Sequence, residues 1–171
     1  MKIYDFDDQY EAGEDAEQTF DEFFGPTFEI EPASRDFQRM EIDRVFVRRG
    51  DGMRFTVEYK ADWKAASTKN AFVETCSVKH KKKEGWALVT CAQIIVYYVV
   101  GWDRFYLVDA AALKFRLGEL CLEYGYTSEV RNSGAYGEYE TQGVAVPLEV
   151  LRGFSLSVFE SKGAVRAPQR S

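Results

Sequence analysis

The sequence contains a single histidine, His80, and only three cysteines, and this scarcity excludes several kinds of active site. Cys76, Cys91 and Cys121 form no Cys-x-x-Cys pair, so we expect buried, reduced thiols and no disulfide framework. A single histidine with three scattered cysteines nearly excludes the usual zinc sites and a serine–histidine triad. Any chemistry must therefore come from carboxylates and lysines.

The chain also lacks a hydrophobic run long enough to span a membrane. Its longest apolar stretch, residues 87–101, is interrupted by Thr90 and Gln93, which is typical of a buried core segment. Residues 1–17 are acidic and contain no apolar segment, so we expect no signal peptide. The sequence therefore predicts a cytoplasmic protein without a membrane partner.

The composition is typical of one globular domain. The 171 residues are 46% hydrophobic and 15% aromatic, and we expect a single domain over residues 1–171 with a loose tail from about residue 161. The net charge of −6 argues mildly against nucleic acid as a partner. Most of the acidic excess lies in residues 5–31, however, while residues 79–83 read Lys-His-Lys-Lys-Lys and offer a local basic surface.

Hydrophobic periodicity predicts strands in the middle of the chain and helices near both ends. The predicted helices cover residues 11–24, 86–93 and 109–124, with Asp109 as the N-cap of the last and Gly125 after its end. The predicted strands cover residues 27–31, 41–49, 53–60, 71–78, 94–100 and 104–108. Residues 61–70, 79–84 and 126–142 are predicted as turns or loops, and residues 143–157 as a strand, a turn at Pro147 and a short helix.

This order of elements indicates an α/β fold of the α+β kind. We expect a central mixed β-sheet flanked by helices on both faces. Residues 94–100 are strongly β-forming and have no polar face, so they are expected to form the central strand, covered on both sides.

A β-hairpin is predicted around the turn signal Gly50-Asp51-Gly52. Glu58 and Lys60 lie two residues apart on its second strand, so they point to the same face. Asp43, on the first strand, falls opposite Glu58 if the turn is Gly50-Asp51 and opposite Lys60 if it is Asp51-Gly52. Both registers place the three side chains on one face, whereas a three-residue loop without a bulge would place Asp43 on the other.

Two carboxylates beside an ammonium group suggest a metal site. Neighbouring carboxylates resist ionising together, and a hard divalent cation such as Mg²⁺ or Mn²⁺ removes that penalty. A cation held by Asp43, Glu58 and a backbone carbonyl would bind phosphate oxygens and activate water. Lys60 would orient or deprotonate that water, or neutralise charge on phosphorus. The alternative is a plain cross-strand ion pair, which stabilises a hairpin by only about a few tenths of a kcal/mol.

Asp43 followed by Glu58-Tyr59-Lys60 resembles the signature of the PD-(D/E)XK nuclease superfamily, without the usual proline before the aspartate. Residues 13–17 resemble the Gly-x-x-x-Glu of the first helix in phage and prophage members. Residues 68–74 resemble their Phe-x-Glu segment, and Gly85-Trp86 followed by Ala92-Gln93 resembles their Gly-Trp…Ala-Asp segment, with Gln93 where an aspartate is common. The resemblance covers roughly residues 11–110.

The resemblance implies a restriction-endonuclease-like core and a role for each matched residue. Asp43 and Glu58 would ligate the metal, and Lys60 would assist the water. Glu17 would complete the ligand set from the first helix, in competition with Glu11, Glu14 and Glu22. Gln93 would hydrogen-bond near the site, and Glu74 would either support the site from a strand beside the hairpin or be an ordinary edge charge.

The function implied is that of a Mg²⁺- or Mn²⁺-dependent deoxyribonuclease of a phage or mobile element, acting in the host cytoplasm. A structure-selective enzyme similar to a Holliday junction resolvase is the sharper expectation, and a homodimer follows from the need for two cuts. Basic side chains that would grip DNA phosphates, unless they only solvate turns, are Lys64, Lys69, Lys79, Lys81, Lys82 and Lys83. Two alternatives stay open: a non-catalytic accessory protein with a nuclease fold, and a DNA mimic that uses residues 5–31 to bind a host or phage protein.

Overall fold

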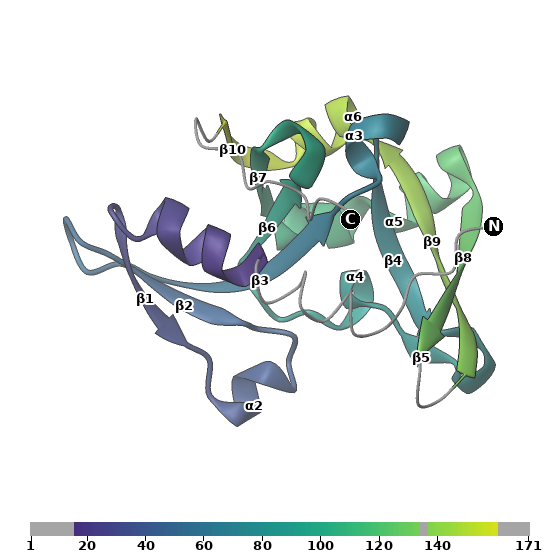
Figure 1. Ribbon diagram of the computed structural model, residues 1–171, viewed down its shortest axis with the longest axis horizontal. Helices are drawn as coiled ribbons and strands as arrows, with labels where there is room; N and C mark the ends of the chain where they lie inside the picture. The colour runs from purple at the N-terminus through teal and green to yellow at the C-terminus, as the bar shows by residue number, and fades with distance from the viewer. Residues whose placement is uncertain (1–15, 134–136, 161–171) are drawn as a thin grey trace, which may run out of the picture.

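The computed structural model describes residues 16–133 and 137–160, which form two β-sheets with helices packed around them (Figure 1). The larger sheet has six strands in the order β1-β2-β3-β6-β7-β10, and the smaller has four in the order β5-β4-β9-β8. The strands are β1 (Phe28–Pro32), β2 (Arg44–Arg48), β3 (Arg54–Asp62), β4 (Asn70–Val78), β5 (Lys83–Glu84), β6 (Ile94–Val99), β7 (Arg104–Asp109), β8 (Tyr126–Ser133), β9 (Gly137–Pro147) and β10 (Ser155–Glu160).

The helices are mostly short. An N-terminal helix covers residues 16–24, and it is the purple helix that lies beside β1 to β3 in Figure 1. The others are α2 (Arg35–Gln38), α3 (Ala65–Thr68), α4 (Trp86–Val89), α5 (Ala110–Tyr124) and α6 (Leu148–Gly153), with 3-10 turns η1 (Lys79–Lys81) and η2 (Val100–Trp102). No helix in the described ranges is long and apolar enough to cross a membrane.

The six-stranded sheet is mixed because β3 and β6 run parallel, while its other pairings are antiparallel. β6 lies between β3 and β7, and its side chains are buried on both faces, which confirms the expected central strand. Val96 and Tyr98 pack with Phe20 of the N-terminal helix on one face. Ile95 and Tyr97 pack with α4, α5, α6 and the smaller sheet on the other. The expected mixed sheet with helices on both faces is therefore confirmed.

One buried network ties the two sheets together at the end of β3. The Tyr97 hydroxyl donates to the carboxylate of Asp62, and the backbone N–H of Phe72 on β4 donates to the Tyr97 hydroxyl at 2.9 Å. The other Asp62 oxygen accepts from the backbone N–H groups of Lys64 and Ala65 at 2.8 Å each, which starts α3. β3 is thus longer than the sequence predicts, and α3 follows where residues 61–70 were expected to be loop.

Several other segments differ from the sequence-based expectation. Residues 126–133 and 137–142 are strands and not a loop, because β8 and β9 pair from Tyr126↔Val144 to Ser133↔Gly137 through backbone hydrogen bonds that side-chain polarity does not reveal. Residues 79–84 contain η1 and β5, and residues 35–38 form the unexpected helix α2. The expected helix at residues 109–124 is confirmed as α5, with Asp109 accepting from the N–H of Ala112. Residues 11–15 and the expected tail from 161 lie outside the described residues.

The cysteines differ partly from expectation in their burial. Cys76, Cys91 and Cys121 are all free thiols, but only Cys76 and Cys121 are half-buried, and Cys91 is exposed. None of them therefore contributes a structural cross-link.

Candidate metal and catalytic site

The hairpin formed by β2 and β3 brings Asp43 and Glu58 together. Its register pairs Arg44 with Val57 and Phe46 with Phe55, so Asp43, one residue before β2, comes opposite Glu58. This is the first of the two registers considered above, although the connection is longer than a two-residue turn. Arg48 N–H donates to the carbonyl of Met53 at 2.8 Å, which leaves four residues in the loop.

Asp43 is fixed just before the first residue of β2, where β3 extends beyond its pairing with β2. Its backbone N–H donates to the carbonyl of Val57 at 2.8 Å, and its carbonyl accepts from the N–H of Ala33 at 3.1 Å. Its carboxylate oxygen Oδ2 accepts from the backbone N–H of Tyr59 at 2.7 Å. On the edge of β3 that faces β2, the side chain thus takes the place of a strand partner for Tyr59, and the Asp43 carboxylate is held beside Glu58.

Glu58 is a fully buried carboxylate. Its Oε1 forms an ion pair with the ammonium group of Lys60, and its Oε2 lies 3.3 Å from the hydroxyl of Thr90. Burial raises the pKa of Glu58 to about 7, Lys60 lowers it in part, and the nearby charges of Asp43 and Glu41 raise it again. An isolated carboxylate in this position is costly, so the site favours a cation.

Lys60 is the local positive charge. Burial alone would lower its pKa, but the charge and hydrogen bond of Glu58, with Asp43 and Glu41, raise it above the ordinary value. Its Nζ lies 5.9 Å from the centre of the Trp86 ring, at the start of α4. The Lys60 side chain is 27% exposed, so the site opens to solvent through this residue.

The segment after α4 packs beside the Glu58 carboxylate. The Thr90 hydroxyl donates to the carbonyl of Glu41 at 2.9 Å and accepts from the N–H of Ala92 at 3.1 Å. The Thr90 carbonyl accepts from Lys114 Nζ of α5 at 2.6 Å. None of these three groups was predicted from the sequence. Glu41 lies two residues before Asp43, so strand alternation could have predicted it on the same face. Thr90 and Lys114 reach the site only through tertiary packing.

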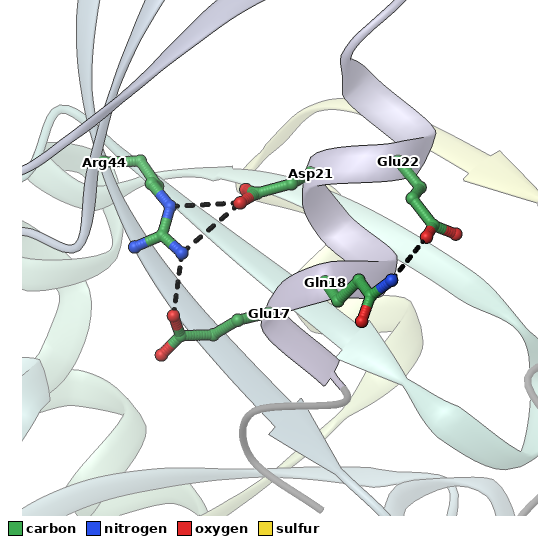
Figure 2. Close-up of a pocket in the computed structure, with 5 residues that line it drawn as sticks. All are labelled: Glu17, Gln18, Asp21, Glu22 and Arg44. Atoms are coloured by element: carbon green, nitrogen blue, oxygen red, sulfur yellow. Dashed lines mark hydrogen bonds and ion pairs between the residues drawn. The ribbon is translucent and has the colours of Figure 1, made fainter.

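Glu17 lies on the other side of the larger sheet. Figure 2 shows the guanidinium group of Arg44 pointing at the N-terminal helix, where it bonds Glu17 at 2.8 Å and Asp21 at 3.3 Å. Asp21 also accepts from the Tyr59 hydroxyl at 2.8 Å. These residues, with Gln18 and Glu22, line an open surface pocket that contains neither Asp43 nor Glu58. The structure therefore does not bring Glu17 to the carboxylate pair, because Arg44 already supplies its counterion.

Gln93 and Glu74 have mainly structural partners. The side-chain oxygen of Gln93 accepts from the backbone N–H of Thr56 at 3.0 Å, which continues the pairing of β3 and β6 two residues before Glu58. Glu74 lies on β4 in the smaller sheet, opposite Gly143, and not on a strand beside the hairpin as expected. The strand beside the hairpin is β6, because its apolar sequence requires cover on both faces.

The expected DNA-binding lysines fall into two groups. Lys64 and Lys69 flank α3 before β4, whereas the basic run 79–83 follows β4. Nine residues of extended strand separate the groups by about 30 Å, so they do not form one patch. Lys79 forms an ion pair with Glu140 at 2.7 Å, and Lys81, Lys82 and Lys83 are exposed beside it at this turn.

The donor set fits a hard divalent cation. Asp43 and Glu58 offer two carboxylates, and the buried Oε1 of Glu58 already has a positive partner in the ammonium group of Lys60. Within the described ranges, no group of three or more His, Cys, Asp or Glu side chains could hold a metal. Mg²⁺ often binds through only one or two carboxylates, with water and substrate phosphate completing its shell, so the pair suffices for such a site.

Comparison with known proteins gives no independent assignment. No protein-family model, curated protein or solved structure matches the chain. The functional conclusion therefore depends on the geometry of the site.

Proposed function

We propose that this protein is a metal-dependent nuclease whose site consists of Asp43, Glu58 and Lys60. The observation that carries the proposal is the buried carboxylate of Glu58, which is ion-paired with Lys60 and lies beside Asp43 in the hairpin formed by β2 and β3. This arrangement supports the role implied by the resemblance to PD-(D/E)XK nucleases.

Asp43 and Glu58 would hold Mg²⁺ or Mn²⁺. A cation bound there would polarise a phosphate oxygen and increase the acidity of a water molecule. Asp43 contributes a carboxylate already oriented by the Tyr59 N–H, so little ordering is required when a substrate binds. Oε2 of Glu58 lies 3.3 Å from the Thr90 hydroxyl, and Oε1 faces Lys60.

Lys60 acts as a cation in this proposal. Because Glu58 and Asp43 raise its pKa, Lys60 stays protonated at neutral pH and is poorly suited to remove a proton. Its ammonium group would instead stabilise negative charge that develops on the phosphate, and would orient the water. Of the roles considered from sequence, charge stabilisation and orientation are therefore favoured over general-base catalysis.

Nucleic acid is the proposed substrate. Lys83 lies three residues before Trp86, so their Cα atoms are within about 11 Å of one another. Gly85 ties this segment to β4, because a Cβ at this position would come within 2.4 Å of the carbonyl oxygen of Glu74. The basic turn and the Lys60 site are therefore joined by a short, anchored segment, which would let one polyanion contact both.

The test is cleavage of linear duplex, single-stranded and branched DNA, and of RNA, with Mg²⁺, Mn²⁺ or EDTA. Asp43→Asn, Glu58→Gln and Lys60→Met should each lose cleavage by at least about 100-fold, which equals about 2.7 kcal/mol of transition-state stabilisation. Glu84→Gln, an exposed carboxylate outside the site, serves as the matched control. No metal-dependent cleavage by the wild type would reject the proposal and favour an accessory or DNA-mimic protein.

A further inference from the structure

Helix α5 carries an apolar stripe that nothing in the described residues covers. Its inner side, including Leu113, Leu117 and Leu120, is buried in the core. On the outer side, Phe115 is 85% exposed and Leu122 is 89% exposed. Two large apolar side chains this exposed on one helix are unusual enough to indicate a contact surface.

The stripe has helical spacing. Ala111, Phe115, Gly118 and Leu122 follow one another at intervals of four, three and four residues, and all four are exposed. An α-helix has about 3.6 residues per turn, so these positions line up along one side of α5, as in the seam of a helix pair. Gly118 has no heavy atom within 4 Å of where its Cβ would lie, so the middle of the stripe is open to a second helix.

We propose that the α5 stripe is the interface with a second copy of this chain, packed antiparallel about a two-fold axis beside Gly118. In this arrangement Phe115 faces Leu122 of the second copy, and Leu122 faces its Phe115, so the apolar contact is self-complementary. Gly118 allows the two helices to approach closely at the axis.

Charge complementarity supports the antiparallel direction. Arg116, Glu119 and Glu123 lie on the same flank of the stripe, and Arg116 already pairs with Glu119 at 2.5 Å within the helix. In an antiparallel pair, equivalent flanks face each other, so Arg116 of one copy lies at the level between Glu119 and Glu123 of the other. A parallel pair would instead oppose these carboxylates to the Lys114 flank, and the Lys114 ammonium is bound to the Thr90 carbonyl.

The proposal does not depend on nuclease activity, and its test is the mass of the full chain measured by analytical ultracentrifugation over a range of concentrations. The wild type should form a dimer. Phe115→Glu and Leu122→Glu should each weaken dimerisation by at least about 30-fold, in keeping with loss of a central apolar anchor. A wild type that is monomeric at every concentration would overturn the proposal, as would dimers that are equally stable with and without these substitutions.

Two further variants separate the interface from the fold. Gly118→Lys improves helix propensity in the monomer, so its melting temperature should be kept or raised while dimerisation weakens. Arg116→Glu should also weaken the dimer, and adding Glu119→Lys and Glu123→Lys should restore it. Failure of the triple variant to dimerise better than Arg116→Glu would contradict the charge pairing.

Single cysteines test the direction, in a background with Cys76, Cys91 and Cys121 replaced by alanine. Gly118→Cys lies beside the axis and should cross-link to itself on oxidation. Ala111→Cys should not, because antiparallel packing separates the two copies of position 111 by about 20 Å along the helices. Efficient cross-linking of Ala111→Cys would show parallel packing and overturn the proposed interface.

Discussion

The carboxylate of Asp43, the residue just before β2, accepts a hydrogen bond of 2.7 Å from the backbone N–H of Tyr59, where β3 extends beyond its pairing with β2. This bond satisfies a donor on β3 that has no strand partner there. It also fixes the Asp43 carboxylate next to Glu58. The same side chain therefore serves the fold and the proposed metal site, and these two roles are separable by substitution.

Asp43→Asn and Asp43→Ala should differ in stability but not in metal binding. Asparagine keeps an oxygen acceptor for the Tyr59 N–H, so the free energy of unfolding should stay within about 1 kcal/mol of the wild type, whereas alanine leaves the N–H without a partner and costs about 1–3 kcal/mol. Both variants lose the carboxylate and should lose the response to Mn²⁺. Urea unfolding with and without Mn²⁺ measures both effects, and equal stabilities of the two variants would contradict the capping role.

The contribution of Glu58 to the stability of the metal-free protein should decrease as the pH rises from about 4.5 to 7. The pKa of Glu58 is about 7 in the folded protein and 4.5 without the fold, so its contribution is fully present below 4.5 and is lost as the pH rises through 7. The size of this contribution is about 3 kcal/mol. Glu58→Gln does not titrate, so the difference in unfolding free energy between the two proteins should show this dependence. A difference that is constant over this range would contradict it.

Divalent cations should reverse this effect. Cation binding requires the ionised form of Glu58, so Mg²⁺ or Mn²⁺ should raise the melting temperature much more at pH 8 than at pH 5. Differential scanning fluorimetry at fixed ionic strength measures the response. Ca²⁺ tests whether the rise in melting temperature needs only a divalent charge rather than a cation that supports catalysis. Glu58→Gln controls for cation binding elsewhere. A shift of the same size in Glu58→Gln would place the cation at another site.

Lys60 and Glu58 should be strongly coupled in stability. Lys60→Met leaves a buried carboxylate without its counterion, and removing one partner of a buried pair costs about 3–5 kcal/mol while the other stays charged. The double variant Glu58→Gln/Lys60→Met should be more stable than the sum of the single changes, with a coupling of at least about 1 kcal/mol. Urea unfolding at pH 8 measures the cycle, and additive effects would show that the ion pair contributes little.

Glu17→Gln should retain cleavage and metal affinity within about threefold, because Arg44 holds the Glu17 carboxylate on the opposite side of the sheet. This ion pair is partly exposed, so the cost in unfolding free energy should be below about 1 kcal/mol. A loss of cleavage as large as that of Asp43→Asn would instead restore Glu17 to the metal site, as its place in the superfamily pattern implies.

The sequence pattern predicts those parts of the fold that depend on residues close together in the chain. The alternation around Gly50-Asp51-Gly52 predicts the hairpin, and parity places Asp43 and Glu58 on one face, as the register shows. The apolar run 94–100 predicts the central strand. Pairings between distant segments were not accessible in this way, so the second sheet, with β8 and β9, was missed, and Glu74 was assigned to the wrong neighbour.

The partners of the site residues were equally inaccessible to local pattern. Thr90 and Lys114 reach the site through tertiary packing of α4 and α5. Glu17 has suitable chemistry and spacing, but the side of the sheet on which its helix packs depends on Phe20 and Phe24. Arg44 then engages Glu17, and no motif indicates that pairing.

A crystal grown with Mn²⁺ and a short DNA strand at pH 8 provides the most direct measurement. The anomalous difference density of manganese should lie within coordination distance, about 2.2 Å, of one oxygen each from Asp43 and Glu58, with a DNA phosphate oxygen in the same shell. Manganese bound only between Glu17 and Asp21, or no manganese near Glu58 in a crystal that contains ordered DNA, would contradict the proposed site.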